Sequence, residues 1–206
     1  MANGKFSNGK RSNLKPVALL LAIALLVGTA VGGTLAWLTD NSGPVKNTFT
    51  VGSVAITLDE ALTDLYGVPV SGADRIPNAT HTDGNTYKLI PGHTYTKDPK
   101  ITVSSDSENC WVFVKLENGL NDTATFNIDN SKWTIVATYT DHSKVYAYNT
   151  VLKAGDDATL FTEFTFAQSA DPETYKSAAI KVTGYAVQAD GFGSAEAAWA
   201  ASGFGG

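Results

Sequence analysis

The sequence predicts an all-β protein, an antiparallel jelly-roll-like β-sandwich with a short C-terminal helix. Short runs of alternating apolar and polar residues, separated by turn residues, recur after Trp37, and this pattern is typical of sandwiches and barrels. No long 3.6-residue periodicity occurs in the same region. The composition agrees, because the 206 residues include 24 Thr and one Met, and Thr favours strands.

In each predicted strand, every second side chain is apolar and is expected to point to the core. Trp111 and Phe113 lie on the opposite face of their strand, and Gly184 allows a bulge before the last strand continues. The predicted apolar faces are Val54, Ile56 and Leu58; Cys110, Val112, Val114 and Leu116; Trp133, Ile135, Ala137 and Tyr139; Phe164 and Phe166; and Ile180 and Val182.

One helix is predicted at the C-terminal end. Ser194 is a suitable N-cap, the alanine-rich stretch 195–201 propagates a helix, and Gly203 ends it. The tail 203–206 is expected to fray. The domain organisation that follows has a signal peptide at 1–36, a processed N-terminal segment at 37–53, the sandwich at 54–193, and the helix with its Gly-rich tail at 194–206.

The first 36 residues have the pattern of a secretory signal peptide. A basic start precedes 11 unbroken apolar residues at 17–27, which are too few to cross a bilayer. Thr34 and Ala36 place small residues at the −3 and −1 positions of a signal-peptidase site, so the mature chain is expected to begin at Trp37. A cut after Ala30 and an uncleaved membrane anchor are the alternatives.

Charge and cysteine content exclude several classes of protein. The chain has 15 Lys and Arg against 20 Asp and Glu. Four of the basic residues and no acid lie in the first 36, so residues 37–206 carry 11 basic and 20 acidic side chains. This balance argues against nucleic-acid binding. A single cysteine, Cys110, excludes an intramolecular disulfide framework, and its strand position favours a small buried apolar side chain.

Four patches of sequence resemble the TasA/camelysin group of secreted proteins from Gram-positive bacteria. They are Gly32-Gly33-Thr34 before the predicted cut with Asp40 after it; Asn47, Phe49 and Gly52 followed by the 54–58 strand; Pro91-Gly92 with Lys97-Asp98-Pro99; and 185–192 with Ala195, Glu196 and Trp199. The resemblance implies a jelly roll, a dedicated signal peptidase, and a place among matrix or surface proteins, some of which form fibres.

A search for catalytic and ligand-binding patterns gives no strong motif. His81, His93 and His142 do not form His-Glu-x-x-His, although a composite site of His81 and His93 stays open. Carboxylate pairs at 59–60, 106/108 and 156–157 match no EF-hand loop and are expected to be solvated strand ends. Trp111, Trp133, Tyr146 and Tyr148 are expected to pack in the core or an interface, with a sugar-binding face as the alternative.

These observations together predict a secreted, non-enzymatic structural protein of the extracellular matrix or cell surface, and a fibre-forming subunit in particular. No cofactor, no metal and no nucleic acid is expected. The expected partners are the signal peptidase during export, copies of the same chain and other matrix proteins, with the membrane only before cleavage. Phe49 and Val51 lie on one face of a segment that can add to a neighbour's sheet. The alternatives are a carbohydrate-binding or adhesin module and a camelysin-type metalloendopeptidase.

Overall fold

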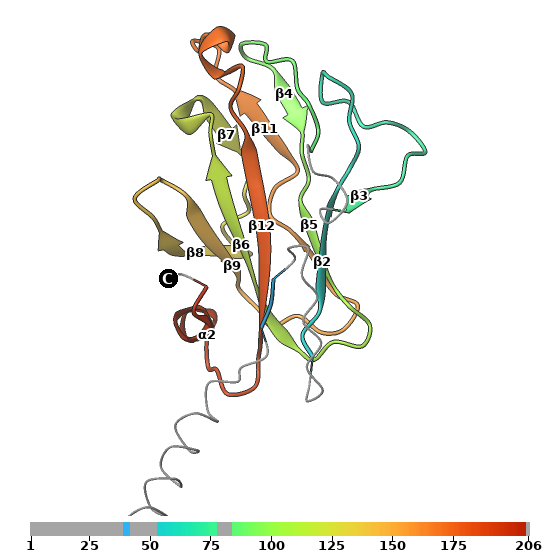
Figure 1. Cartoon of the computed structure of the whole chain (residues 1–206), viewed down its shortest axis with the longest axis vertical. Coiled ribbons are helices and arrows are strands. Elements are labelled where there is room, and N and C mark those ends of the chain that lie inside the picture. Colours follow the sequence, from blue (N-terminus) through green and yellow to red (C-terminus); the bar gives the residue numbers. More distant parts are fainter. Residues whose placement is uncertain (1–38, 42–52, 78–83, 205–206) are drawn as a thin grey trace, which may run out of the picture. The chain divides into compact units, whose positions relative to one another are not determined.

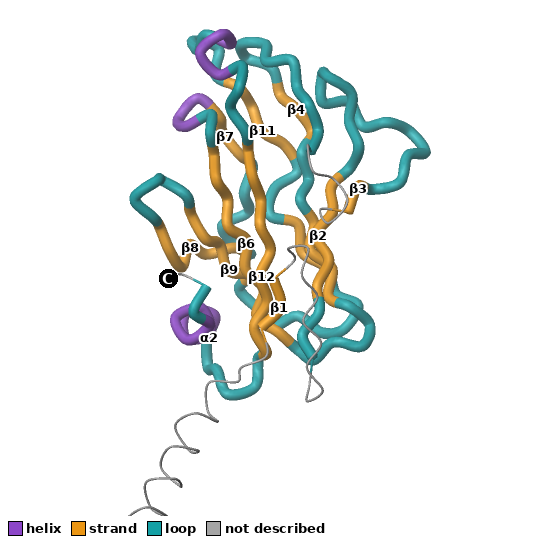
Figure 2. Tube along the Cα trace, in the orientation of Figure 1, coloured by secondary structure: helices purple, strands orange, loops and turns teal. Residues whose placement is uncertain are grey.

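The computed structural model describes residues 39–41, 53–77 and 84–204. In these residues the chain is an all-β sandwich with one short C-terminal α-helix, which confirms the predicted class (Figure 1). All strand pairings are antiparallel, and strands with their connecting loops make up most of the trace (Figure 2). No helix in the described part of the chain is both long and apolar enough to cross a membrane.

The first layer of the sandwich is a five-stranded sheet with the order β1-β12-β6-β9-β8. Its strands are β1 (Thr39–Asn41), β12 (Ile180–Gln188), β6 (Cys110–Asn118), β9 (Lys144–Tyr148) and β8 (Trp133–Thr138). Strands β12 and β6 pair over nine residues in unbroken register, and Gly184 lies opposite Val114. The bulge predicted at Gly184 is therefore wrong, because no extra residue interrupts the ladder there.

The second layer consists of two smaller sheets, with the orders β10-β5-β2-β3 and β4-β11-β7. One 3-10 turn, Asn121–Thr123, precedes β7, and a second, Pro172–Tyr175, precedes β12. The strands are β2 (Ile56–Glu60), β3 (Ile76–Pro77), β4 (Thr94–Thr96), β5 (Lys100–Val103), β7 (Ala124–Phe126), β10 (Asp157–Thr159) and β11 (Glu163–Phe166).

Pro99 separates the two smaller sheets without changing their register. Residues 94–96 pair with residues 163–165, and residues 100–102 pair with residues 157–159. The two residue numbers have the same sum in every pair, so the register is the same on both sides of the break. Between the sheets, Lys97 N donates to Thr162 O over 3.1 Å and Leu160 N donates to Pro99 O over 3.2 Å. Pro99 has no N–H to donate. The layer therefore continues from β7 through β11/β10 and β4/β5 to β2 and β3, with β7 and β3 at opposite edges.

The main core lies between the two layers. The inner face of β6 supplies Cys110, Val112, Val114 and Leu116, as predicted, and β2 supplies Ile56 and Leu58. A second buried cluster of Tyr95, Leu120, Phe164 and Phe166 lies under the three-stranded sheet, which confirms that Phe164 and Phe166 share a face. Alternation along these strands explains the arrangement, since successive side chains point to opposite faces.

Helix α2 (Ala195–Ser202) covers the outer face of the first sheet. As predicted, Ser194 caps its N-terminus, accepting a hydrogen bond from Ala197 N over 3.3 Å, and Gly203 ends it with φ of 73°. The tail is not frayed at Phe204, because its ring packs against Tyr185 at 4.8 Å and also contacts Trp199.

Candidate functional site

A groove with a volume of about 750 Å³ opens beside strands β7 and β8, and we call it the edge groove. Both strands are terminal in their sheets, so each has a strand neighbour on one side only. The groove thus lies between the two layers at the edge opposite β3. It is lined by Leu116, Asn118, Asn121, Asp122, Ala124, Thr125, Phe126, Ile128, Asn130, Ile135, Thr138, His142, Lys144 and Tyr146.

A β-bulge in β8 shapes one wall of the edge groove. Ile135 lies opposite Tyr146 and Ala137 lies opposite Val145, so Val136 is an extra residue. The bulge puts Ile135 and Thr138 on the groove side, although regular alternation would place them on opposite faces. The predicted common face of Trp133, Ile135, Ala137 and Tyr139 is therefore wrong after Ile135. Ala137 and Tyr139 pack instead with the cluster under α2.

Two residues of the edge groove have left-handed backbone conformations. Asn121 has φ of 51° and His142 has φ of 64°, and they are the two non-glycine residues with positive φ among those described. Hydrogen bonds fix the turn at His142, since Asp141 Oδ1 accepts from Ser143 N over 3.0 Å and from Ser143 Oγ over 2.7 Å. The hydrogen bond from the Ser143 hydroxyl is the main cause of the lowered pKa of Asp141. Such conformations concentrate at functional sites.

An apolar hairpin lies at the opposite edge of the sandwich, in the segment that joins β2 to β3. We define it as residues 62–70, which are closed by the antiparallel bridge between Thr63 and Pro69. Its exposed apolar side chains are Leu65 at 50%, Tyr66 at 46%, Val68 at 58% and Val70 at 44%.

Side-chain and backbone hydrogen bonds make the apolar hairpin a defined structure. Asp64 Oδ1 accepts from the backbone N–H groups of Tyr66 and Val68, each over 2.9 Å. Gly67 has φ of 77°, and a Cβ at this position would lie 2.8 Å from Tyr95 Cα. Thr96 N donates to Gly67 O over 3.2 Å. Only glycine combines this conformation with this contact.

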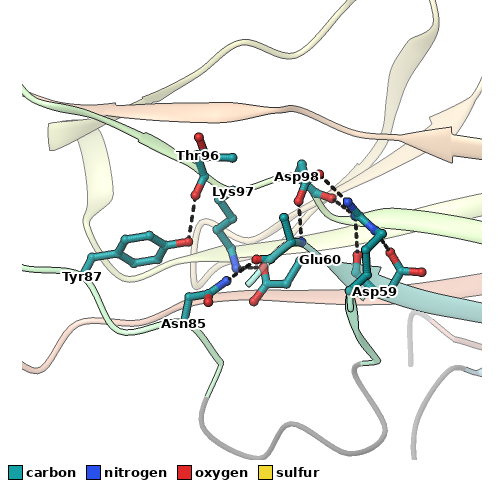
Figure 3. Close-up of polar contacts among 9 residues, drawn as sticks. Asp59, Glu60, Asn85, Tyr87, Thr96, Lys97 and Asp98 are labelled. Carbon is teal, nitrogen blue, oxygen red and sulfur yellow. Dashed lines mark hydrogen bonds and ion pairs between the residues drawn. The ribbon is translucent and has the colours of Figure 1, made fainter. Parts of the chain in front are cut away.

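One carboxylate binds both ends of the segment that carries the apolar hairpin. Asp98 Oδ1 accepts from Ala61 N over 2.8 Å, and Asp98 Oδ2 accepts from an Arg75 NH group over 2.6 Å. Arg75 also forms an ion pair with Asp59. Figure 3 shows Asp59 and Asp98 converging from β2 and from the break before β5. The Lys-Asp-Pro motif of residues 97–99 thus has a structural role.

A second ion pair lies beside the first. Lys97 Nζ is 2.5 Å from Glu60 Oε2, and Lys97 is buried with 7% of its surface exposed. Tyr87 OH donates to Thr96 O over 3.0 Å, and burial is the main cause that raises the pKa of Tyr87. Figure 3 shows Glu60 at the Lys97 ammonium and the neighbouring hydrogen bond from Tyr87 to Thr96. The carboxylates at 59–60 are therefore paired rather than solvated strand ends.

The described residues test the predicted histidine and aromatic sites only in part. His93 Nε2 lies 2.9 Å from Tyr66 O, His142 lines the edge groove, and His81 lies outside the described residues. Where the structure describes the chain, no group of three or more His, Cys, Asp or Glu is placed to bind a metal. Trp133, Tyr146 and Tyr148 belong to the main core cluster and Trp111 packs with the cluster under α2, which confirms the expected packing role and does not place all four on one sugar-binding face.

The residues predicted for processing and assembly lie outside the described part of the chain. These are Thr34, Ala36 and Trp37 for processing, and Phe49 and Val51 for assembly. The neighbouring residues 39–41 form β1, which pairs with β12 of the same chain through Thr39 opposite Val187. A strand donated by this segment must therefore leave that edge or begin after Asn41.

A comparison with family models, curated proteins and solved structures finds no match to this chain. The resemblance to the TasA/camelysin group stays a prediction. Sequence reasoning also missed the edge groove and the apolar hairpin. The hairpin has a sequence signal, namely four large apolar residues within 65–70 among turn residues. The groove has none, since its wall depends on the bulge at Val136.

Proposed function

We propose that this chain is an exported, non-enzymatic structural subunit of the extracellular matrix or cell surface that associates with copies of itself. The observation that carries the proposal is the edge groove between two terminal strands, β7 and β8. Terminal strands can accept main-chain hydrogen bonds from another polypeptide. A groove bordered by two of them suits a protein partner better than a small molecule.

The export part of the proposal rests on the pattern of residues 1–36. A basic start, an apolar stretch of 11 residues and the Thr34-x-Ala36 spacing support removal by a signal peptidase. After that step the chain has no basic leader and carries an excess of nine acidic side chains. The TasA/camelysin resemblance supports the same assignment to a matrix or surface protein.

The experiment is expression of the full-length gene in a Gram-positive host, followed by collection of the protein from the medium. N-terminal sequencing should give Trp37, and negative-stain microscopy with light scattering should show filaments or other homo-oligomers. Retention in the membrane fraction contradicts export. A monomer at every accessible concentration contradicts self-association.

A glycan-binding module is the second candidate function, because the edge groove is rich in amide and hydroxyl groups. Asn130, Thr125 and Thr138 line it together with Phe126 and other apolar residues, a mixture that suits sugars. Retention of the exported protein on purified cell-wall glycan, lost in Asn130→Ala, would favour this function. Bound zinc with chelator-sensitive cleavage of casein would instead favour the metalloendopeptidase.

A further inference from the structure

We propose that the apolar hairpin of one copy inserts into the edge groove of the next, giving a head-to-tail contact. This inference rests on the self-association proposed above and identifies the two surfaces that meet. It names an element other than the N-terminal segment as the inserting part. The partner is a second copy of this chain.

The distribution of exposed apolar side chains is the first argument. Among the described residues five large apolar side chains are exposed, and four of them belong to the apolar hairpin. The fifth, Ile135 at 47%, lines the edge groove. Both halves of one apolar contact are therefore present on the same molecule. Exposed apolar groups gathered on a rigid element mark interaction sites.

Shape gives the second argument. The apolar hairpin is held against β4 at its buried Gly67, and Asp64, Gly67 and the Asp98 contacts fix its backbone, while its four apolar side chains stay exposed. The edge groove has a volume of about 750 Å³ and a partly apolar lining that includes Phe126 and Ile128. Protein pockets that bury most of a ligand have volumes of roughly 300–1,000 Å³. A preformed hairpin and a preformed groove lose little conformational entropy when they bind.

Charge complementarity gives the third argument. Exposed Asp64 and Asp74 flank the apolar side chains of the hairpin segment, and Lys88 lies over the Tyr66 ring at 5.9 Å. The edge groove carries Lys144 and His142 together with one acid, Asp122. The two acids beside the hairpin can face Lys144, and Lys88 can face Asp122. This reciprocal arrangement limits repulsion between two acidic molecules.

The topology determines what kind of assembly results. The apolar hairpin lies on the β3 side of the second layer and the edge groove lies at β7, and these are opposite edges (Figure 1). When two different surfaces of identical subunits bind each other, a dimer still has one free hairpin and one free groove. Repetition gives a closed ring or an open filament.

Disulfide trapping tests the contact directly. Val68→Cys on the apolar hairpin and Thr125→Cys in the edge groove are combined in one chain, and the exported protein is treated with a mild oxidant. A ladder of covalent multimers is expected on a non-reducing gel. Native Cys110 is fully buried and should not react. The matched control replaces Thr125→Cys by Thr57→Cys, an exposed threonine of β2 outside the groove, and should give no ladder.

Substitution and charge exchange provide an independent test. Val68→Ser with Val70→Ser should weaken self-association by about tenfold or more, because buried apolar contact is lost. Lys144→Glu should weaken it as well, and Asp74→Lys in the same chain should restore it. The control Lys176→Glu, at a side chain that is 71% exposed outside the groove, should change little. Circular dichroism verifies that each variant is folded.

The outcomes separate this inference from the proposed function. If the unmodified protein assembles but all these variants assemble equally well and no ladder forms, the hairpin contact is wrong and self-association stands. If the unmodified protein never assembles, both are wrong. If Val68→Ser with Val70→Ser abolishes flotation with phosphatidylcholine or phosphatidylglycerol vesicles and leaves assembly unchanged, the hairpin contacts lipid and the inference is overturned.

Discussion

Gly67 determines where the apolar hairpin lies. Its positive φ of 77° allows the sharp turn after Tyr66, and its missing side chain allows the backbone to approach Tyr95. Gly72 has a similar φ of 74°, but among the described residues no atom beyond its chain neighbours lies within 4 Å of the place that a Cβ would take there. A substitution at Gly72 therefore reports the cost of the backbone conformation alone, whereas one at Gly67 reports this cost together with that of the close contact.

Gly67→Ala is expected to destabilise the protein more than Gly72→Ala. Both variants bear the conformational cost of about 1–2 kcal/mol for a left-handed alanine, and only Gly67→Ala adds a collision with the Tyr95 backbone. Urea unfolding measures the difference, and limited proteolysis should show cleavage within 62–70 for Gly67→Ala alone. Equal unfolding free energies would mean that the Tyr95 contact does not constrain the hairpin.

Cys110 is expected to behave as a buried apolar residue. Its surface is 0% exposed, and burial, with a smaller effect of Asp156, raises the pKa of its thiol from 9.0 to about 12. A thiol reagent should therefore react only when the protein unfolds. Cys110→Ala should cost roughly 1–2 kcal/mol through lost volume and leave oligomerisation unchanged. Rapid labelling of the folded protein, or loss of assembly in the variant, would indicate an exposed or bridging thiol.

The raised pKa of Cys110 also predicts a pH dependence. Well below pH 9 the thiol is protonated in both the folded and the unfolded state, so it does not make the free energy of unfolding depend on pH. Between pH 9 and pH 12 the unfolded chain loses this proton and the folded chain keeps it, so the free energy of unfolding falls as pH rises. The advantage of the natural protein over Cys110→Ala should therefore shrink above pH 9. Urea titrations at pH 8 and pH 10.5 measure this difference.

At the scale of elements, the break at Pro99 joins the sandwich to the segment between β2 and β3. Pro99 has no backbone N–H to donate, and beside it the side chains of Lys97 and Asp98 bind Glu60, Ala61 and Arg75. The charged groups are 7–32% exposed, so removal of one partner leaves the others poorly solvated. Such a loss costs more than the loss of a surface ion pair.

Asp98→Ala is expected to lower the free energy of unfolding by about 1–3 kcal/mol, because Ala61 N and Arg75 lose their acceptor. Asp98→Asn should retain part of this stability, since its side-chain oxygen can still accept from Ala61 N. Hydrogen exchange should accelerate across 61–75 in the alanine variant. The control Lys176→Ala removes an exposed pair with Glu173 and should change stability by less than about 0.5 kcal/mol. Unchanged exchange in Asp98→Ala would contradict the role of this carboxylate.

The elements that the sequence predicts well are those whose pattern is local. Alternation identified both faces of β6, and Ser194 with Gly203 identified the bounds of α2. The bulge at Val136 could not be predicted, because neither glycine nor a turn residue marks it. The contacts of Asp98 join residues 23 and 37 positions away, and no pattern in one sequence predicts such a pairing. The edge groove depends on the bulge at Val136 and on residues that are distant in the sequence, so sequence reasoning missed it.

At the scale of the whole molecule, net charge opposes the self-association that we propose. Residues 37–206 carry 20 acidic and 11 basic side chains, so copies repel at low ionic strength. Apolar contact through the hairpin and groove is not weakened by salt. Self-association of the exported protein should therefore increase between 20 mM and 500 mM sodium chloride, as measured by light scattering. Dissociation at high salt would indicate that ion pairs dominate the contact.

The N-terminal segment can be tested separately. Deletion of Trp37–Lys46 behind the intact signal peptide removes β1, whose three residues pair with the edge of β12. If Phe49 and Val51 act in a donated segment, a folded, exported monomer is expected, because the shortened segment can no longer extend to a neighbouring subunit. Filaments that persist in the deletion variant but disappear in Val68→Ser with Val70→Ser would assign assembly to the hairpin alone.

Because Asp98 binds both Ala61 and Arg75, the residues between them begin and end at fixed positions on the sandwich. None of the exposed hairpin side chains belongs to the core clusters. Gly72, which follows the hairpin and is exposed, is thus an attachment point for foreign peptides, which could be inserted there while Gly67, the Thr63–Pro69 bridge and the Asp98 contacts stay in place. If the subunits form filaments, each subunit would display one copy of the peptide, at a regular spacing along the filament.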